Sequence, residues 1–210
     1  MDKLVIIGAG GFAKLVVDIV ESSYKNTKKI IGFLDEDNKL VGKSIHQYPI
    51  LGNLDWIKEN DISDTMFVCA ISDTKAKKRI LNIPYIKSLN FDTIIHASAT
   101  ISPHAKISKD VIINAGAIIA SDVTIYEHSF VNFDCTIGHD VVISEYVSVM
   151  PSVNIAGNAL IHQGAYLGIN ATILQNTKIG SFSTVGASAL VTKDVEDDTT
   201  VIGVPAKPME

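Results

Sequence analysis

A six-residue repeat is the feature that most constrains how this chain can fold. Every sixth residue from Ile95 to Val191 is branched and aliphatic, and the register holds across 95–190 without a gap. The residue four places after each of these is always small or β-branched. A period of six fits neither an α-helix, with about 3.6 residues per turn, nor a half-buried strand, with a period of about two. It fits a parallel β-helix, in which each hexad supplies one short strand and one corner.

The repeat also predicts which residues are neighbours. The branched position should point into the β-helix, and the small position should turn inward near a corner, where space is limited. With three hexads to a coil, residues eighteen apart lie above one another at about 4.8 Å, the spacing of neighbouring strands. Residues far apart in the sequence can therefore be placed side by side through this eighteen-residue column.

Residues 1–94 precede the repeat and have the pattern of alternating strands and helices. We expect strands at Lys3–Ile7, Lys29–Leu34, Pro49–Gly52, Met66–Ile71 and Phe91–Ile95, and helices at Phe12–Ser22, Asp55–Asn60 and Lys75–Leu81, the last capped by Ser72 and stopped by Pro84. This order predicts a Rossmann-like βαβαβ domain with a small parallel sheet. The domains, 1–94 and 95–210, should join directly near Ile95. The repeat should stop after Val191, with a loop at Lys193–Asp198.

Composition narrows the classes of partner and compartment. The net charge of −5 argues against a nucleic-acid or acidic-membrane partner. The basic residues of the third predicted helix are interpreted as a solvated face: Lys75, Lys77, Lys78 and Arg79. Cys69 and Cys135 both fall in predicted core strands, so we interpret them as buried thiols. The first apolar run is too short for a signal peptide or a membrane span, and cytoplasm is the default location.

A glycine turn, GAGGFA at 8–13, follows the first predicted strand and opens the first helix. Glycines there let the backbone approach a phosphate, and a helix N-terminus favours negative charge. Asp35 ends the next strand, so the pattern is compatible with a dinucleotide site. However, 94 residues cannot supply two mononucleotide-binding halves. A single nucleotide, such as the nucleoside diphosphate of an activated sugar, fits better; NAD and a turn without a ligand are the alternatives.

His139 is the histidine of the repeat with the most informative neighbours. One coil further on lies Gly157, and one coil back lies Ser121. An imidazole beside a residue without a side chain leaves a notch that could admit a thioester and expose a backbone N–H. Imidazole exchanges protons near neutral pH, so this pair would suit a general base beside an oxyanion donor. The alternative is an exposed corner histidine without a function.

Metal binding and covalent catalysis are less well supported. One eighteen-residue column contains His104, Asp122, Asp140 and Asn158. Asn and Asp are common at β-helix corners, so this column predicts no metal site. Cys135 occupies a small inward position, which argues against a nucleophile. We interpret His104 and His162 as surface residues.

The hexads resemble those of the bacterial hexapeptide-repeat acyltransferases, and five short segments narrow the resemblance. These are IIGAGGFAK (6–14), IGFLDED (31–37), YPILGN (48–53), IGHD (137–140) and IGVPAK (202–207). In order, and across essentially the whole chain, they resemble the sugar acetyltransferases that include sialic-acid O-acetyltransferases and the N-acetyltransferases of UDP- or dTDP-linked 4-amino-sugars. The resemblance implies a left-handed β-helix, a homotrimer, acetyl-CoA as co-substrate, no metal, and a role in bacterial surface polysaccharide synthesis.

The resemblance also implies roles for individual residues. His139 would be the general base, supported by Asp140, with acetyl-CoA in the groove between neighbouring β-helices. The residues implied for acetyl-CoA are Gly157, Ile169, Ala187, Lys207 and Ser148. The residues implied for the nucleotide sugar are Gly8, Gly10, Gly11, Phe12, Asp35 and Glu36. Ser148 and Phe12 stand where many amino-sugar members carry histidine, which keeps O-acetylation of sialic acid or a related sugar as an alternative.

The function expected is therefore direct transfer of acetyl from acetyl-CoA to the amine of a nucleotide-linked 4-amino-sugar. A hypothesis of another class is a non-catalytic nucleotide-sugar-binding protein that uses the β-helix only to trimerise. That hypothesis predicts no binding of CoA. An NAD-dependent enzyme would be stabilised by NAD, which we do not expect.

Overall fold

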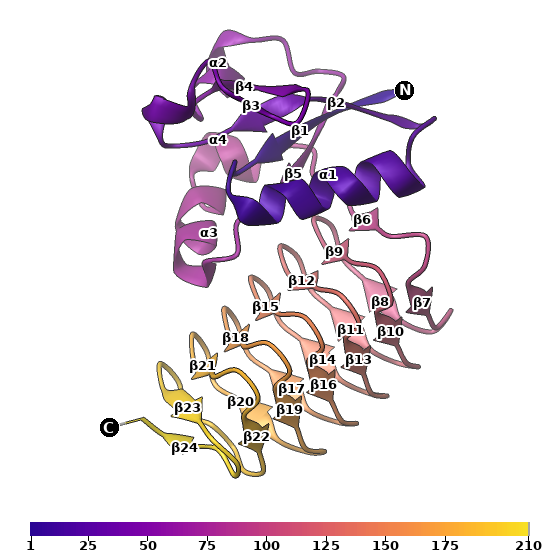
Figure 1. The fold of residues 1–210 in the computed structure, drawn as a ribbon, viewed down its shortest axis with the longest axis vertical. Coiled ribbons are helices and arrows are strands. Elements are labelled where there is room, and N and C mark those ends of the chain that lie inside the picture. The colour runs from indigo at the N-terminus through magenta and orange to yellow at the C-terminus, as the bar shows by residue number, and fades with distance from the viewer. Residues whose placement is uncertain (210) are drawn as a thin grey trace.

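The computed structural model describes residues 1–209 and contains an α/β unit stacked on one end of a parallel β-helix (Figure 1). The α/β unit has a five-stranded sheet in the order β3-β4-β2-β1-β5. Its strands are β1 (Asp2–Ile7), β2 (Lys28–Leu34), β3 (Ser44–Ile45), β4 (Tyr48–Gly52) and β5 (Thr65–Cys69). Its helices are α1 (Gly11–Ser23), η1 (Asn38–Leu40), α2 (Trp56–Glu59), α3 (Thr74–Leu81) and α4 (Pro84–Lys87). All pairs except β3–β4 are parallel, which confirms the Rossmann-like class.

Several local expectations for this unit need correction. The cap of α3 is Asp73, whose carboxylate accepts the Ala76 N–H at 2.7 Å, and not Ser72. Pro84 does not stop α3, which has already ended at Leu81; it starts α4, because proline is well suited to the first turn of a helix. The expected strand Phe91–Ile95 is divided, since Phe91 bridges Phe67 while β6 (Ile94–Ile95) already belongs to the β-helix.

The β-helix consists of three sheets, whose strands are parallel apart from β24, as the repeat predicts. The eight-stranded sheet contains β6, β9 (Ile112–Ile113), β12 (Phe130–Val131), β15 (Ser148–Val149), β18 (Tyr166–Leu167), β21 (Thr184–Val185), β23 (Thr200–Ile202) and β24 (Lys207–Pro208). The six-stranded sheet contains β7 (Thr100–Ile101), β10 (Ile118–Ile119), β13 (Thr136–Ile137), β16 (Asn154–Ile155), β19 (Thr172–Ile173) and β22 (Leu190–Val191). The remaining sheet contains β8 (Lys106–Ile107), β11 (Thr124–Ile125), β14 (Val142–Ile143), β17 (Leu160–Ile161) and β20 (Lys178–Ile179).

The pairing and the burial follow the six-residue pattern. Ile95 lies opposite Ile113, so one coil is three hexads. From Ile113 to Val191, every branched position is at most 2% exposed. At most corners, the third residue after the branched position has a positive φ. Asp122, Asp140 and Asn158 are examples, at 60–62°. Asn and Asp tolerate this left-handed conformation better than most residues, which explains the column that they form.

The coil continues beyond Val191, contrary to expectation. Val195 bridges Ile179, and Val201 pairs with Val185, so the step is sixteen residues instead of eighteen. Val195 and Val201 are 7% and 4% exposed and extend the core. β24 then folds back antiparallel on β23. The shortened coil breaks the six-residue register, which is why the repeat alone does not reveal it.

Removing an inward side chain from the middle of the β-helix should be costly. Ile143 is fully buried, and Ile143→Ala is expected to lower the free energy of unfolding by about 3 kcal/mol, because it leaves a cavity that the stacked coils cannot close. Ile202→Ala, at a side chain that is 47% exposed, should change it by about 0.5 kcal/mol or less. Denaturant unfolding measures both, and equal losses would contradict this account of the core.

The α/β unit covers only the upper part of the eight-stranded sheet, and α1 lies across it (Figure 1). On the outer face of that sheet Ile94, Ile112, Phe130 and Ser148 are at most 2% exposed. The following strands of the same face remain partly exposed. The Phe12 ring of α1 packs on the Phe130 ring, with 4.2 Å between centroids. The first coils of the β-helix therefore form the floor of the α/β unit.

A buried carboxylate also joins the two units. Asp110 lies at a β-helix corner and is 1% exposed. One of its oxygens accepts the N–H of Cys69, at the end of β5, at 2.8 Å, and the other lies 2.7 Å from Nδ1 of His128. Burial raises the pKa of Asp110, while the His128 ring acts in the opposite direction. The edge of the α/β sheet is thus tied to the β-helix by hydrogen bonds as well as by apolar packing.

The sequence led us to expect that the basic face of α3 is solvated. The structure shows that it is not wholly so. Lys77 is 1% exposed, and burial lowers its pKa to about 8. A lysine in an unfolded chain has a pKa of about 10.4, so between about pH 8 and pH 10 the unfolded state binds more protons and stability rises with pH.

Lys77→Met should remove this part of the pH dependence. We expect the free energy of unfolding of the wild type, relative to Lys77→Met, to rise between about pH 8 and about pH 10. Denaturant unfolding of both proteins across that range measures the difference. A difference that stays constant with pH would show that Lys77 is not a buried ammonium group.

Candidate active site

His139 lies at the corner that connects β13 to β14. Its side chain is 64% exposed, and its Nδ1 lies 2.8 Å from Oδ2 of Asp140. An ionised carboxylate only accepts hydrogen bonds, so this contact favours the tautomer with the proton on Nδ1. The lone pair is then on Nε2, which is the arrangement that a general base requires.

Gly157 lies directly against the His139 ring, in the stacking that the eighteen-residue column predicts. A Cβ built on Gly157 would lie 2.7 Å from both Cε1 and Nε2 of the imidazole, so only glycine leaves the ring this place. A Cβ on Gly138 would lie 2.7 Å from the Gly157 nitrogen. Within residues 1–209, no protein group accepts a hydrogen bond from the Gly157 N–H. A lone pair and a free backbone donor are therefore side by side.

Ile169 and Ala187 lie together at a different corner, the one that leads from the eight-stranded to the six-stranded sheet. The Ser188 N–H donates to the Ile169 carbonyl at 2.8 Å, which places Ala187 one coil beyond Ile169. Gly168 repeats the role of Gly138, since a Cβ there would lie 2.7 Å from the Ala187 nitrogen. Within one chain, these residues and His139 occupy separate corners of the coil. Lys207 is exposed in β24, which pairs with β23 at the last coil.

Ser148 does not belong with the residues expected at acetyl-CoA. It is fully buried beneath the α/β unit, and its hydroxyl donates to the Ser72 carbonyl at 2.8 Å. It also accepts a hydrogen bond from Lys77 Nζ at 3.2 Å. Because this side chain has no surface to offer a co-substrate, we remove it from the acetyl-CoA set.

The glycine turn lies at the carboxyl end of β1, where α1 begins. Gly8 has a φ of 102°, and a Cβ there would lie 2.9 Å from the Ala70 carbonyl oxygen, so both the conformation and the space require glycine. A Cβ on Gly10 or Gly11 would meet nothing within 4 Å, so this part of the turn is open to a ligand. The first turn of α1 has no side-chain cap. The Ala13 N–H donates to the Gly10 carbonyl at 3.2 Å, while the N–H groups of Gly11 and Phe12 remain available to an anion.

The two acidic residues expected at the nucleotide sugar already have protein partners. Asp35 accepts the N–H of Ala9 at 2.7 Å and that of Asp37 at 2.9 Å, so it fixes the shape of the glycine turn. Glu36 forms a bidentate ion pair with Arg79 of α3, at 2.8 and 2.5 Å, and this hydrogen bonding lowers the pKa of Glu36. Phe12 points to the β-helix, as its packing on Phe130 shows.

The sheet order reveals a second wall of this site that sequence reasoning missed. From β1 the chain moves to β2 on one side, and it later returns to β5 on the other side of β1. Ligands of parallel α/β sheets bind at such a reversal, outside the carboxyl ends of the strands. The loop Ala70–Asp73 after β5 faces the glycine turn across this point. The polar residues that follow the apolar strand were a signal, but Ser72 was interpreted only as a helix cap.

Other chemistry has little support in the structure. No group of three or more His, Cys, Asp or Glu side chains within residues 1–209 could hold a metal ion. Cys69 and Cys135 are free and buried, as expected. Burial raises the pKa of Cys135 to about 11, so a nucleophilic thiolate is not available there. No helix of the described residues has the length and apolar character that a membrane crossing requires.

Comparisons with known proteins agree with this fold. A family model described as the PglD N-terminal domain matches residues 3–83. No curated protein sequence matches the chain. Among solved structures, the acetyltransferase domain of PglB from Neisseria gonorrhoeae, in complex with acetyl coenzyme A, is 28% identical with a TM-score of 0.91, covering 99% of each chain.

Two further structures extend the likeness. Perosamine N-acetyltransferase from Caulobacter crescentus, in complex with CoA and GDP-perosamine, is 25% identical with a TM-score of 0.91, covering 99% of this chain and 97% of that one. WeeI from Acinetobacter baumannii is 25% identical with a TM-score of 0.88, covering 98% of this chain and 99% of that one.

The α/β unit and the β-helix, with their likeness to solved acetyltransferases over both units, indicate an acyltransferase of the hexapeptide-repeat class. Within that class, the chain is similar to solved sugar acetyltransferases over both units, and the family match covers most of the α/β unit.

Proposed function

We propose that this protein transfers acetyl from acetyl-CoA to the amine of a nucleotide-linked 4-amino-sugar, with His139 as general base. The observation that carries the proposal is the contact between the His139 ring and Gly157, which puts a basic nitrogen beside an unused N–H. The PglB domain was solved with acetyl coenzyme A, and perosamine N-acetyltransferase with CoA and GDP-perosamine. These two structures support the classes of donor and acceptor.

The notch formed by Gly138 and Gly157 is the proposed place of the thioester. Its carbonyl oxygen accepts the Gly157 N–H, which needs no rearrangement because no protein acceptor competes for it. As negative charge develops on that oxygen, one such donor contributes about 3 kcal/mol to the stability of the transition state. The second glycine, Gly138, keeps the approach to the N–H open.

The proton follows a single path in this mechanism. The amine nitrogen attacks the thioester carbon while Nε2 of His139 takes the proton from the amine. Asp140 holds Nδ1 and stabilises the imidazolium that forms. When the carbon–sulfur bond breaks, the imidazolium returns the proton to the sulfur, and CoA leaves as the thiol. No acetyl-enzyme is formed, so both substrates must be bound together.

The separation of the two corners supports a site shared between chains. His139 lies at one corner, whereas Ile169 and Ala187 lie at another. Met150 lies one coil before Gly168, next to the corner of Ile169 and Ala187. It packs in the same apolar cluster as Phe12, beside the glycine turn. In the proposed homotrimer, His139 of one chain therefore faces the acetyl-CoA and acceptor residues of its neighbour.

O-acetylation of a sugar hydroxyl is the second candidate. The observation that favours it is the presence of Ser148 and Phe12 at positions where a histidine would be expected for many amino-sugar acceptors. A hydroxyl needs the same base and the same oxyanion donor, so His139 and Gly157 do not discriminate between the two reactions.

A panel of acceptors tests the proposal. The protein is incubated with acetyl-CoA and nucleotide 4-amino-sugars, or with free and CMP-linked sialic acid, and release of thiol is recorded. We expect release with a nucleotide 4-amino-sugar. Release only with the sialic acids would establish the second candidate. No release with any acceptor, together with no binding of CoA at millimolar concentration by calorimetry, would favour a non-catalytic binding protein.

A further inference from the structure

The buried serine and lysine between the two units have no place in the mechanism above, yet they contact its acceptor side. Ser148 comes from β15 of the β-helix, and Lys77 from α3 of the α/β unit. The Ser148 hydroxyl donates to the Ser72 carbonyl at 2.8 Å, and Lys77 Nζ donates to that hydroxyl at 3.2 Å and to the Val147 carbonyl at 3.4 Å. A continuous hydrogen-bond chain thus runs from the β-helix to the loop Ala70–Asp73.

That loop faces the glycine turn, where the acceptor is proposed to bind. It follows β5, directly beside the glycine turn at the end of β1. The two segments are in close contact, because a Cβ on Gly8 would lie 2.9 Å from both the Ala70 oxygen and Cγ1 of Ile71. A shift of the loop would therefore move the turn as well. The position of Ser72 on the β-helix sets where both walls lie.

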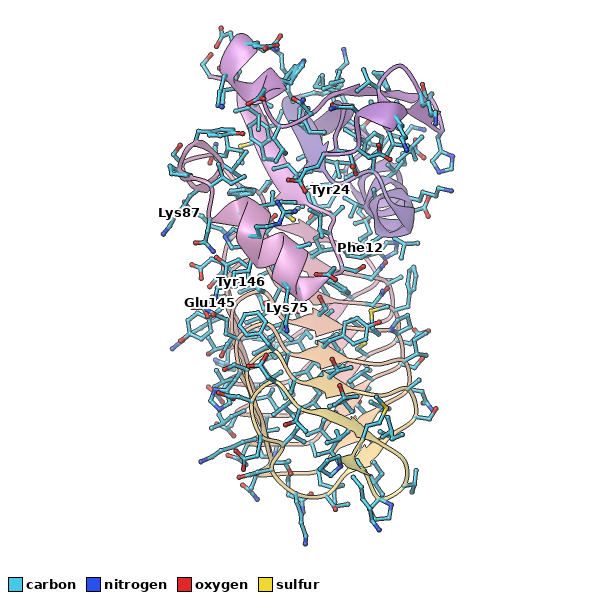
Figure 2. All side chains as sticks on the ribbon, turned by 90° about the vertical axis from the view of Figure 1, so that its left-hand side faces the viewer. Phe12, Tyr24, Lys75, Lys87, Glu145 and Tyr146 are labelled. Atoms are coloured by element: carbon cyan, nitrogen blue, oxygen red, sulfur yellow. The ribbon has the colours of Figure 1, made fainter. Side chains whose placement is uncertain are left out.

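A lysine is an unusual choice for this place if packing alone mattered. The ammonium group is desolvated. Two hydrogen-bond acceptors, the face of the Phe130 ring, 5.0 Å from Nζ, and the electrostatic attraction of Asp110 and Asp73 compensate for this in part. Replacing a buried charge by an apolar side chain of similar size is often neutral or stabilising. Figure 2 shows α3 lying against the upper coils, with Lys75 near the end of the helix that approaches the β-helix. Lys77 and Ser148 therefore serve to fix the position of this end of α3 on the β-helix.

We infer that Lys77 and Ser148 are positioning residues, which hold the loop Ala70–Asp73, and with it the acceptor side of the site, in a fixed position on the β-helix of the same chain. The inference rests on the proposed function, since it concerns where the acceptor is held. Neither side chain touches a substrate. Their effect should therefore appear in the binding of the acceptor and leave the binding of acetyl-CoA unchanged, because the acetyl-CoA residues belong to the corners of the β-helix.

Ser148→Ala and Lys77→Met test this inference, with Ser183→Ala as the matched control. Ser183 is 1% exposed, and its hydroxyl donates to the Gly180 carbonyl at 2.7 Å, so its loss costs a similar buried hydrogen bond without touching the α/β unit. We expect Ser148→Ala and Lys77→Met to raise KM for the nucleotide sugar about tenfold, with KM for acetyl-CoA changed by no more than about twofold. Ser183→Ala should leave both KM values unchanged.

Hydrogen exchange supplies a readout that does not depend on catalysis. In Ser148→Ala, the amides of 70–74 and 8–11 should exchange faster than in the wild type, whereas Ser183→Ala should not affect them. The midpoint of unfolding of Lys77→Met at pH 7 should be no lower than that of the wild type.

The outcomes separate the inference from the proposed function. If the wild type transfers acetyl to no acceptor, the proposed function fails, and the exchange rates still decide whether Ser148 anchors the loop. Equal exchange in Ser148→Ala and the wild type would overturn the inference. It would also be overturned if Ser148→Ala and Ser183→Ala had the same KM for the nucleotide sugar.

Discussion

His139→Ala is expected to lower kcat about 10³-fold, within the range usual for the removal of a general base. The reason is that Nε2 of His139 is the basic atom beside the free N–H of Gly157. The ring is largely exposed and fills no part of the core, so its loss should not change the fold. Steady-state kinetics with acetyl-CoA and the preferred acceptor measures the loss, and calorimetry should show acetyl-CoA affinity close to that of the wild type.

His162→Ala is the control for this prediction. His162 is another exposed histidine of the β-helix, and neither the column nor the contacts give it a role. We expect its kcat to equal that of the wild type. If His139→Ala retained near-normal turnover, the assignment of the base would be wrong.

Gly157→Ala is expected to lower kcat/KM about 10²-fold or more, since it disturbs the base and the oxyanion donor together. The new Cβ would lie 2.7 Å from Cε1 and Nε2 of His139, closer than real Cβ atoms come to other groups. The imidazole must therefore turn away, which separates it from Asp140 and narrows the notch. Kinetics measures the loss. Because the ring that meets the Cβ is the exposed end of a side chain and can turn, thermal unfolding should show a midpoint close to that of the wild type.

The double variant Gly157→Ala with His139→Ala separates the two effects. Without the ring, the Cβ meets no imidazole, and the unfolding midpoint should be close to that of His139→Ala. Its turnover should be about as low as that of His139→Ala, because residues that act together do not contribute additively. If the loss of turnover in the double variant equalled the losses of both single variants combined, the two residues would act independently.

The β-helix could be derived almost completely from the sequence, because a period of six determines both the inward face and the stacking. The eighteen-residue column placed Gly157 beside His139 with no other information, and the structure has that contact. The last coil escaped because its step is sixteen residues, which no longer matches the repeat. A periodic pattern reveals what conforms to it and conceals a coil that is shortened.

The contacts between the two units could not be derived in the same way. Lys77 lies in a run of basic residues and has the spacing of an exposed helix face, yet it is buried against Ser148. Its burial depends on how α3 meets the eight-stranded sheet, which the sequence of α3 alone does not specify. Ser148 was noted only for the histidine that it replaces, and its contact with Ser72 required the position of the loop after β5.

The α/β unit falls between these two cases. The strand–turn–helix pattern of residues 1–23 predicted β1 and α1 closely. The topological reversal between β1 and β5 needed the sheet order, because strand positions do not state which strands are neighbours. The glycine turn was therefore recognised as one wall, while the loop Ala70–Asp73 was not.

The chemical nature of the acetylated product tests the central claim most directly. The wild type is incubated with acetyl-CoA and nucleotide 4-amino-sugars, and the product is analysed by mass spectrometry before and after treatment with hydroxylamine, which cleaves esters and leaves amides intact. The account predicts a nucleotide sugar that carries one acetyl group, resistant to hydroxylamine and absent when His139→Ala replaces the wild type. An acetyl group that hydroxylamine removes, or a product formed equally well by His139→Ala, would contradict it.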